Sequence, residues 1–353
     1  MTRYLITGGA GFIGSCLVKK LAAKPNSICI LDKLSYSSNI SNISSELKKK
    51  NVQLIKIDIS NYKKTLKYIY NFKPDIILHL AAESHVDRSI DYNYPFIKSN
   101  ILGTHSILES VRFYFNDLNK RKKNFFKFIH VSTDEVYGDL GNKKTLFKET
   151  TKFDPSSPYS ATKASSDLLV NAWSKTYGIP SIITNCSNNF GPYQHPEKLI
   201  PHMIISALRG KKLPIYGNGK QIRDWIYVED HISALIKICK KGKIGQTYNI
   251  GGSNQLRNIQ IVKKICLYLD KYYKKTKKNS FFNLITYVKD RPAHDTHYAV
   301  NVEKIKKHIN WKPSKKFEKF LNNTIKWYII NSIWWKKILN KNYKLKRLGL
   351  KND

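Results

Sequence analysis

Five side chains in the middle of the chain are of types that carry out acid–base chemistry. Thr133, Asp134 and Glu135 follow the apolar run FFKFIHV, which is typical of a buried strand, and open α/β sheets bind their ligands at the carboxyl ends of such strands. A hydroxyl and two carboxylates would then share one crevice. Tyr159 and Lys163 stand four residues apart in a stretch with helical apolar spacing, so they would lie on one helix face. An ammonium beside a phenol favours the phenolate, and Tyr159 could therefore act as a base near neutral pH while Lys163 stays charged.

A glycine-rich turn at the start of the chain indicates which cofactor these side chains would face. The segment TRYLITGGAGFIG places Gly8, Gly11 and Gly14 between a short apolar run and a helical pattern. Glycines let the backbone turn tightly and approach a pyrophosphate, while the helix start supplies N–H donors. Asp32 ends the next apolar run, about 20 residues on, where an acidic residue binds the ribose 2′-hydroxyl of NAD. A carboxylate there would repel a 2′-phosphate, which favours NAD over NADP, although the neighbouring Lys33 leaves NADP open.

Two further apolar runs end at residues that would complete the same site. The first ends at Asp58, which could bind the adenine or cap a helix that begins near Asn61. The second leads into LAAESHVDRS, where we interpret His85 and Asp87 as a hydrogen-bonded structural pair rather than a proton relay. The residues expected to bind the cofactor are Gly8, Gly11, Phe12, Ile13, Gly14, Asp32, Lys33, Leu34, Ser35, Asp58, Ile59, Leu80, Ala81, Ala82, Ser84, Ser99, Tyr159, Lys163 and Asn189.

The order of elements predicts two structural parts. A long amphipathic helix is expected over 94–115 and a polar surface loop over 116–124, and prolines after Asn189 carry the chain out of the first sheet. Arg223 would either form a structural salt bridge with Asp224 or bind a diphosphate bidentately. We expect a Rossmann-type doubly wound parallel α/β sheet formed by 1–186, to which 222–252 return, and a smaller mixed C-terminal substrate-binding lobe formed by 187–221 and 253–353.

Composition bounds the class of protein. The net charge of +37 suggests nucleic-acid binding, but only nine of the 62 basic residues are arginine, the residue that base-edge and bidentate phosphate recognition favours. We interpret the lysine excess as compositional drift and expect no nucleic-acid partner. The five scattered cysteines indicate neither disulfides nor a zinc site, so no metal is expected and a reducing cytoplasm fits. No apolar stretch approaches the ~20 residues of a membrane span, and no signal peptide is evident, so no membrane association is expected.

These segments together resemble the nucleotide-sugar dehydratases and epimerases of the extended short-chain dehydrogenase/reductase superfamily. The resemblance runs from TGGAGFIG through LAAESHVDRS, VSTDEVYG, PYSATKA, NCSNNFGPYQHPEKLIP, QIRDWIYVEDH and YNIGG to DRPAHD. It implies a homodimer that pairs through helices 94–115 and 159–177, with NAD as cofactor and a nucleotide sugar, dTDP-glucose, as substrate. The substrate-binding residues that it implies are Ser84, Thr133, Asn188, Lys198, Leu199, Pro214, Tyr216, Arg223, Asn249, Arg291 and His294.

The chain departs from the family pattern at four positions. Ala293, Thr296 and His297 stand where the family commonly has a glycine and two arginines, and Ser99 stands where threonine is usual. The first group weakens the expectation of tight nucleotide binding at that edge of the site.

The resemblance also implies a reaction. The acids at 134 and 135 mark, by resemblance, the dehydratases, which are hydro-lyases, because epimerases of this fold lack them. Tyr159, with Lys163 and Thr133, would take the proton from the C4 hydroxyl while hydride passes to NAD. Glu135 would then remove the C5 proton, and protonated Asp134 would protonate the departing C6 hydroxyl. Finally, hydride would return to C6. The expected product, dTDP-4-keto-6-deoxyglucose, supplies deoxysugar routes such as dTDP-rhamnose biosynthesis. Two alternatives stay open: a nucleotide-sugar C4 epimerase and a non-catalytic basic nucleic-acid-binding protein.

Overall fold

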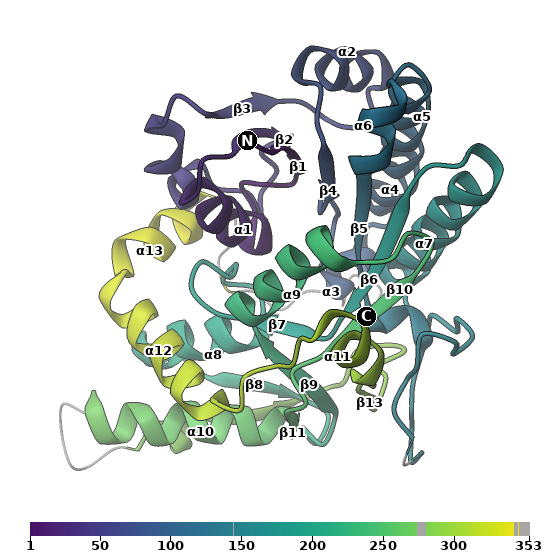
Figure 1. The fold of residues 1–353 in the computed structure, drawn as a ribbon. Helices are drawn as coiled ribbons and strands as arrows, with labels where there is room; N and C mark the ends of the chain where they lie inside the picture. Colours follow the sequence, from purple (N-terminus) through teal and green to yellow (C-terminus); the bar gives the residue numbers. More distant parts are fainter. Residues whose placement is uncertain (144, 274–279, 342–344, 346–353) are drawn as a thin grey trace.

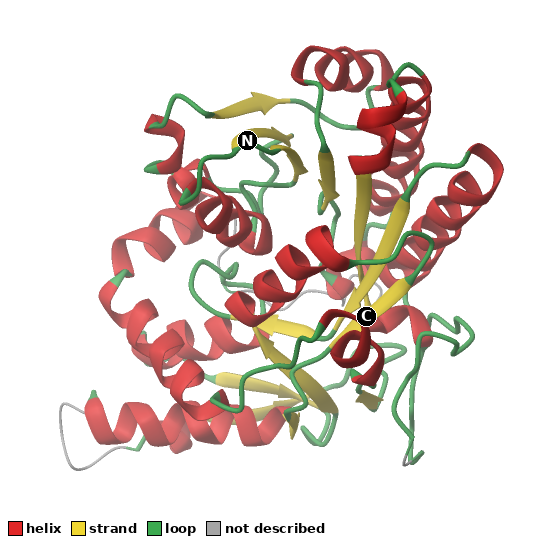
Figure 2. Cartoon of the chain, in the orientation of Figure 1, coloured by secondary structure: helices red, strands yellow, loops and turns green. Residues whose placement is uncertain are grey.

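A seven-stranded parallel sheet forms the centre of the molecule (Figures 1 and 2). The computed structural model describes residues 1–143, 145–273, 280–341 and 345. The strands lie in the order β10-β6-β5-β4-β1-β2-β3, and each neighbouring pair is parallel. The winding reverses between β1 and β4, which is the switch point where such sheets bind ligands. This confirms the predicted fold class. The strand bounds are β1 Arg3–Thr7, β2 Ser27–Asp32, β3 Val52–Lys56, β4 Ile76–His79, β5 Lys127–Thr133, β6 Ser181–Cys186 and β10 Thr247–Ile250.

Helices cover both faces of this sheet because alternate residues of a strand point to opposite sides. Tyr4 and Ile6 of β1 enter the core beneath α1 and α9, whereas Leu5 enters the core beneath α2, α5 and α7. A sheet buried on both faces explains why its strands are continuous apolar runs. The helix bounds are α1 Phe12–Ala22, α2 Tyr62–Phe72, α5 Gly103–Asn116, α7 Pro158–Tyr177, α9 Val228–Lys241 and α11 Glu303–Ile309, the last packed against α9 and β10.

The long helix expected over 94–115 is present but is interrupted. It consists of α4 (Tyr94–Phe96), a π-helical segment η3 (Ile97–Leu102) and α5. Short π-helical segments of this kind often occur at functional sites. The expectation of a loop over 116–124 was wrong in part, because Asn119 caps a short helix, α6 (Lys120–Phe125), by accepting the N–H of Lys122.

A second lobe lies below the main sheet in the view of Figure 1. Its strand β9 (Ile222–Tyr227) pairs with β7 (Asn188–Phe190), β11 (Gln255–Arg257) and β13 (His297–Tyr298), and β8 (Leu213–Tyr216) pairs with β12 (Ile285–Val288). Residues 222–252 therefore serve both parts: β9 lies in the second lobe, whereas α9 and β10 cover and extend the first sheet. The lobe's helices are α8 Leu199–Leu208, α10 Asn258–Tyr272, α12 Phe317–Ile330 and α13 Ser332–Lys341.

Short helical segments connect the larger elements. They are α3 Val86–Asp91 and the 3-10 turns η1 Ile40–Ile43, η2 Glu46–Lys48, η4 Asp134–Tyr137 and η5 Phe281–Leu284. In the part of the chain that the structure describes, no helix is long and apolar enough to cross a membrane. The last residues assigned to the second lobe from the sequence, 342–344 and 346–353, lie outside the described residues.

Candidate active site

Two adjoining cavities lie between the carboxyl ends of the central strands and the second lobe. Glu135, Asn188, Glu197 and Lys198 line both of them. All the catalytic candidates and nearly all the predicted cofactor residues line the first cavity. These are Gly8, Gly11, Phe12, Ile13, Gly14, Asp32, Lys33, Ser35, Asp58, Ile59, Leu80, Ala81, Ala82, Ser84, Ser99, Thr133, Asp134, Glu135, Tyr159, Lys163 and Asn189. The exception is Leu34, which does not line the cavity and whose N–H donates to the Asp32 carboxylate.

The glycine turn has the shape that a dinucleotide requires. Gly8 has φ of +70°, and a Cβ there would lie 2.9 Å from the backbone of Ala81. A Cβ on Gly14 would lie 2.1 Å from the carbonyl oxygen of Gly8, so α1 can pack this closely only with glycine. Gly11 lines the cavity as the N-cap of α1, and a Cβ there would lie 3.3 Å from the carbonyl oxygen of Gly8. These are the tight-turn, close-packing and close-approach roles of the dinucleotide fingerprint.

Asp32 and Lys33 define the edge of the cavity where a ribose would lie. Asp32 is buried and accepts from the N–H groups of Ala10 and Leu34 and from the hydroxyl of Ser38. The Lys33 ammonium forms a 2.7 Å ion pair with Glu83. Because Glu83 neutralises Lys33, the charge arrangement at this edge does not favour the extra phosphate of NADP.

The acid and base candidates meet where β5 ends. Thr133 ends β5 and caps η4, which carries Asp134 and Glu135. Burial first, and then the charge of Glu135, raise the pKa of Asp134 well above its usual range. Burial also raises the pKa of Glu135, but nearby cations oppose that rise, chiefly Arg291 and Lys198. The two neighbouring carboxyls therefore differ in the charge around them, with Asp134 the more readily protonated.

Tyr159 and Lys163 reach the same cavity from α7. That helix begins with Pro158 in its first turn and with a capping box between Ser157 and Ser160, a combination that defines a helix start. Burial and the charge of Glu135 raise the pKa of Tyr159 well above 10, the opposite of the lowering expected from the sequence. The Lys163 ammonium bonds the carbonyl oxygen of Val131 at 3.0 Å, so it is anchored under β5.

A buried polar group lies beneath Lys163. Asp167, one helical turn further along α7, is completely enclosed and lies 3.1 Å from His130 Nε2. Burial lowers the pKa of Lys163, whereas Asp167 raises it. Asp167 accepts a 3.0 Å bond from the Asn185 amide, and its own pKa is raised to about 6 by burial, against the influence of Lys163.

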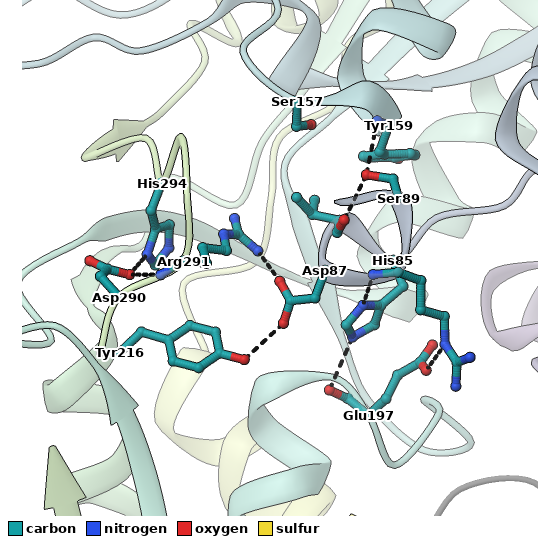
Figure 3. Close-up of polar contacts among 12 residues, drawn as sticks. His85, Asp87, Ser89, Ser157, Tyr159, Glu197, Tyr216, Asp290, Arg291 and His294 are labelled. Atoms are coloured by element: carbon teal, nitrogen blue, oxygen red, sulfur yellow. Dashed lines mark hydrogen bonds and ion pairs between the residues drawn. The ribbon is translucent and has the colours of Figure 1, made fainter. Parts of the chain in front are cut away.

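The second cavity collects the implied substrate residues. Asn188, Lys198, Leu199, Pro214, Tyr216, Arg223, Arg291 and His294 all line it, while Ser84 and Thr133 line the first cavity. Figure 3 shows Arg291 and Tyr216 converging on Asp87, with His294 held by Asp290 at 2.5 Å. Within this part of the site, Lys198 donates to the carbonyl oxygen of Ser84.

Two expected pairs in this region are arranged differently. Arg223 donates to the carbonyl oxygens of Ile222 and Asp295 and lies over the Tyr298 ring, whereas Asp224 accepts from the N–H groups of Gly252 and Asn254. The expected pair of His85 and Asp87 has separate partners. His85 forms hydrogen bonds with the carbonyl oxygen of Glu197 and the N–H of Arg88. Asp87 accepts hydrogen bonds from Arg291 and Tyr216.

Asn249 is a correction to the expected site. It lines neither cavity, because it lies inside the protein, where its amide bonds the hydroxyl of Tyr137 and the carbonyl oxygen of Phe147. A different asparagine, Asn258, lines the second cavity and has a buried side-chain oxygen that accepts no hydrogen bond from any described residue. In the sequence Asn258 looks like an ordinary helix start, so only the fold identifies it.

Further lining residues were also missed. His85, Asp87, His202, Met203, Trp225 and Tyr298 line the second cavity, and Gln194 and His195 line the first. Thr296 and His297, two of the residues that differ from the family pattern, line neither cavity. Their backbone N–H groups donate to the Asp139 carboxylate. Among the described residues, no group of three or more His, Cys, Asp or Glu side chains could hold a metal ion.

A glycine cradle at the switch point, with a Tyr–Lys pair facing it, defines a dinucleotide-dependent enzyme of the short-chain dehydrogenase/reductase class. Residues 5–324 match the family model described as GDP-mannose 4,6 dehydratase. The chain is 47% identical over 352 residues to dTDP-glucose 4,6-dehydratase of Neisseria meningitidis, covering 99% of each chain. The chain belongs to the family of dTDP-glucose 4,6-dehydratases.

Solved structures agree with this assignment. The structure of dTDP-glucose 4,6-dehydratase from Bacillus anthracis in complex with NAD is 41% identical and has a TM-score of 0.84, covering 96% of this chain and all of that one. A UDP-glucose 4-epimerase from Thermotoga maritima has a TM-score of 0.81 but only 26% identity, covering 94% of this chain and 100% of its own. The fold is common to both enzymes, and the higher identity lies with the dehydratases.

Proposed function

We propose that this chain converts dTDP-glucose into dTDP-4-keto-6-deoxyglucose and water, with NAD as its bound cofactor. The observation that carries this proposal is the pair of acids, Asp134 and Glu135, on the cavity that Tyr159 also lines. Epimerisation at C4 on this fold would use neither of these two carboxyl groups. The product would feed deoxysugar synthesis such as the dTDP-rhamnose route.

The first cavity fits NAD. The turn packs so closely, Gly8 against Ala81 and Gly14 against Gly8, that only glycine fits at these two positions, and Asp32 would bond a ribose hydroxyl. The 4,6-dehydratase from Bacillus anthracis was solved in complex with NAD. When bound, NAD accepts a hydride from sugar C4 and returns it at C6, and its positively charged ring favours the phenolate of Tyr159. The chain's own side chains move the protons.

Tyr159 would take the proton from the C4 hydroxyl. Its phenol is buried, and a hydrogen bond with Thr133 opposes the rise in the Tyr159 pKa that burial and Glu135 cause. Lys163, held under β5 and next to Asp167, supplies positive charge from the same helix face. Together these groups would stabilise the phenolate that forms when the proton is removed from Tyr159.

Elimination of water would use the two acids in different protonation states. Glu135 lies near Arg291, Lys198 and Arg223, which favour its ionised form, so it would remove the C5 proton made acidic by the C4 ketone. The pKa of Asp134 is raised well above its usual range by burial and by Glu135, so it would hold a proton and give it to the departing C6 hydroxyl. Neighbouring acids whose environments separate their pKa values are a known basis for such divided roles.

The second cavity would hold the nucleotide part of the substrate. Arg223 and Arg291 would bond the diphosphate, because guanidinium groups match phosphate oxygens bidentately, and Lys198 and Asn188 lie at the junction with the first cavity. Glu135 also lies at this junction, so a sugar attached to a diphosphate in the second cavity would reach it.

The test is to incubate the purified chain with dTDP-glucose and weigh the product by mass spectrometry. The proposal predicts a nucleotide sugar lighter by one water. A product of unchanged mass with inverted C4 would indicate an epimerase, and no product together with salt-sensitive nucleic-acid binding would indicate the binding-protein alternative.

We also infer a homodimer formed by the faces of η3, α5 and α7. Large apolar side chains on these elements are exposed, among them Leu102 (48%), Phe113 (42%) and Leu168 (59%), more than a helix covered on one side alone would need. Light scattering should report a dimer, and Leu168→Glu should shift it toward monomer. The same substitution at Leu267, an equally exposed leucine on α10, is the control and should leave the dimer intact.

The five cysteines are all free thiols. This supports a reducing, cytoplasmic setting, since disulfides persist mainly in oxidising compartments.

A further inference from the structure

Asp87 joins two side chains of the second cavity that come from distant parts of the chain. One oxygen of its carboxylate accepts from Arg291 Nη1 at 2.7 Å, and the other accepts from the Tyr216 hydroxyl at 2.8 Å. Figure 3 shows both side chains pointing at Asp87. Asp87 lies on α3 beside the central sheet, whereas Tyr216 ends β8 in the second lobe. The carboxylate therefore bridges the two parts of the protein at the substrate cavity.

The contact between Asp87 and Arg291 is a buried ion pair. Burial raises the pKa of Asp87. The charges of Arg291 and His85 and the hydrogen bonds from Arg291 and Tyr216 together lower it by more, so the net shift of the Asp87 pKa is downward. Burial lowers the pKa of Arg291, and Asp87 more than offsets this. Each group thus keeps the other charged in a place where either alone would be costly.

Arg291 has binding capacity left after this contact. Its Nε is buried, and no described residue accepts a hydrogen bond from it, although Arg291 lines the cavity. A guanidinium is planar, so fixing Nη1 on Asp87 also fixes the direction of the remaining N–H groups. Because Arg291 and Tyr216 occupy both oxygens of Asp87, the group that a ligand meets is the donor edge of Arg291 rather than a bare carboxylate.

We propose that Asp87 is a positioning residue of the nucleotide-sugar site: it holds Arg291 and Tyr216 in place to receive a nucleoside diphosphate. This role of Asp87 rests on the proposed function, because it requires a substrate that carries a diphosphate. An unrestrained arginine loses rotamer freedom when a ligand fixes it, and Asp87 already restricts Arg291 before the ligand arrives. Preorganisation of this kind raises affinity without a new contact to the ligand.

The experiment measures binding, not turnover. The protein with its dinucleotide bound is titrated with dTDP by calorimetry and with thymidine by ligand-detected NMR, for the unaltered chain, Asp87→Asn, Arg291→Lys and the double variant. Asp117→Asn is the control, because Asp117 follows α5, lines neither cavity and accepts an exposed hydrogen bond from the Tyr70 hydroxyl. Thermal unfolding of each variant reports its fold.

We expect Asp87→Asn to weaken dTDP binding by about 30-fold, which corresponds to the roughly 2 kcal/mol of rotamer freedom that an unrestrained arginine loses when it is fixed, and to change thymidine binding less than about twofold. In the Arg291→Lys background, Asp87→Asn should add little, because Asp87 acts through Arg291. A purely structural defect would weaken both ligands and would add to Arg291→Lys.

The proposal is overturned if Asp87→Asn binds dTDP as well as or better than the unaltered chain, if thymidine binding falls equally, or if the two substitutions are additive. If Asp87→Asn does not fold, Asp87→Glu keeps the charge, displaces it by one methylene, and is judged by the same criteria. Failure of the unaltered chain to bind dTDP would refute the proposed function itself. Normal binding by the unaltered chain with an unaffected Asp87→Asn variant refutes only the role of Asp87.

Discussion

Glu135 faces the same cavity as Tyr159, and after burial its charge is the strongest influence that raises the pKa of the Tyr159 phenol. The two groups are assigned to successive proton transfers, from the C4 hydroxyl and then from C5. An ionised Glu135 holds the proton on Tyr159 more firmly, so the base for the second step opposes the first. The two roles can therefore be separated by substitution.

Glu135→Gln should stop the reaction after oxidation at C4. The amide keeps the shape and the hydrogen bonding but cannot accept the C5 proton, so elimination should slow by at least about 100-fold, and loss of the charge removes one influence that raises the pKa of Tyr159. Single-turnover absorbance of reduced nicotinamide after addition of dTDP-glucose should rise and persist, with a 4-keto hexose recovered on quenching.

Tyr159→Phe is the matched variant for the first step. It keeps the ring and removes the hydroxyl, so no reduced nicotinamide should form. Normal turnover by Glu135→Gln, or reduced nicotinamide building up at the native rate in Tyr159→Phe, would show that these roles are wrongly assigned.

Asp167→Asn should move the alkaline limb of the activity profile to lower pH. Asp167 raises the pKa of Lys163 against burial, so without its charge the ammonium is lost at lower pH and the phenolate of Tyr159 loses its stabilising partner. The measurement is kcat/KM against pH. Ser165→Ala, at a half-buried position on the same helix whose hydroxyl bonds the carbonyl oxygen of Ala161, should leave the profile in place. An unshifted alkaline limb in Asp167→Asn would mean that the charge of Asp167 does not support Lys163.

The purified chain should carry NAD that survives gel filtration. A cofactor restored to its starting state in each turnover has no need to leave, and the Lys33–Glu83 ion pair leaves Asp32 as the dominant charge beside a 2′-position. Chromatography of the dinucleotide released by denaturation should show NAD in the unaltered chain and in Lys33→Ala alike. Release of NADP, or of no dinucleotide after incubation with NAD, would contradict this.

Stability should fall as the pH drops from about 7 toward 4. Burial lowers the pKa of His202 to about 4 and of His231 to about 3, whereas unfolded histidine titrates near 6.5. Between these pKa values each histidine is protonated in the unfolded chain and neutral in the folded chain. Each histidine therefore lowers the free energy of unfolding by up to about 1.4 kcal/mol for every pH unit that the pH falls. Urea unfolding at about pH 7, 6 and 5 measures how the free energy of unfolding changes with pH, and His231→Gln should reduce this slope. A free energy of unfolding that does not change over this range would show that these histidines are not buried in the neutral form.

Local patterns made much of the fold predictable. Each central strand is an apolar run that stops at a polar or small residue, as at Asp32, and a sheet buried on both faces needs such runs. The placement of Tyr159 and Lys163 on one cavity was also predictable, because they share a face of one helix with a proline and a capping box at its start. These signals involve residues close together in the chain.

The parts that escaped prediction depend on contacts between distant residues. Asn249 and Asn258 are both asparagines beside a strand or helix end, and only the folded sheet shows that the first bonds Tyr137 inside the protein and the second faces the cavity. The direction of the Tyr159 pKa was mistaken for the same reason, since burial and the charge of Glu135, both set by the fold, raise it. In the sequence Asp87 looked like a partner of His85, two residues before it, yet its ion pair is with Arg291.

The π-helical segment η3 limits how this part of the gene can change in length. Ser99 lies within it and faces the cofactor cavity, and the side-chain amide of Asn100 bonds both the N–H and the carbonyl oxygen of Glu83. Each residue of an α-helix turns the chain by about 100°, so deleting one residue between Asn100 and α5 would rotate Ser99 and Asn100 relative to α5 and carry both side chains away from their partners. Insertions and deletions should therefore be excluded here.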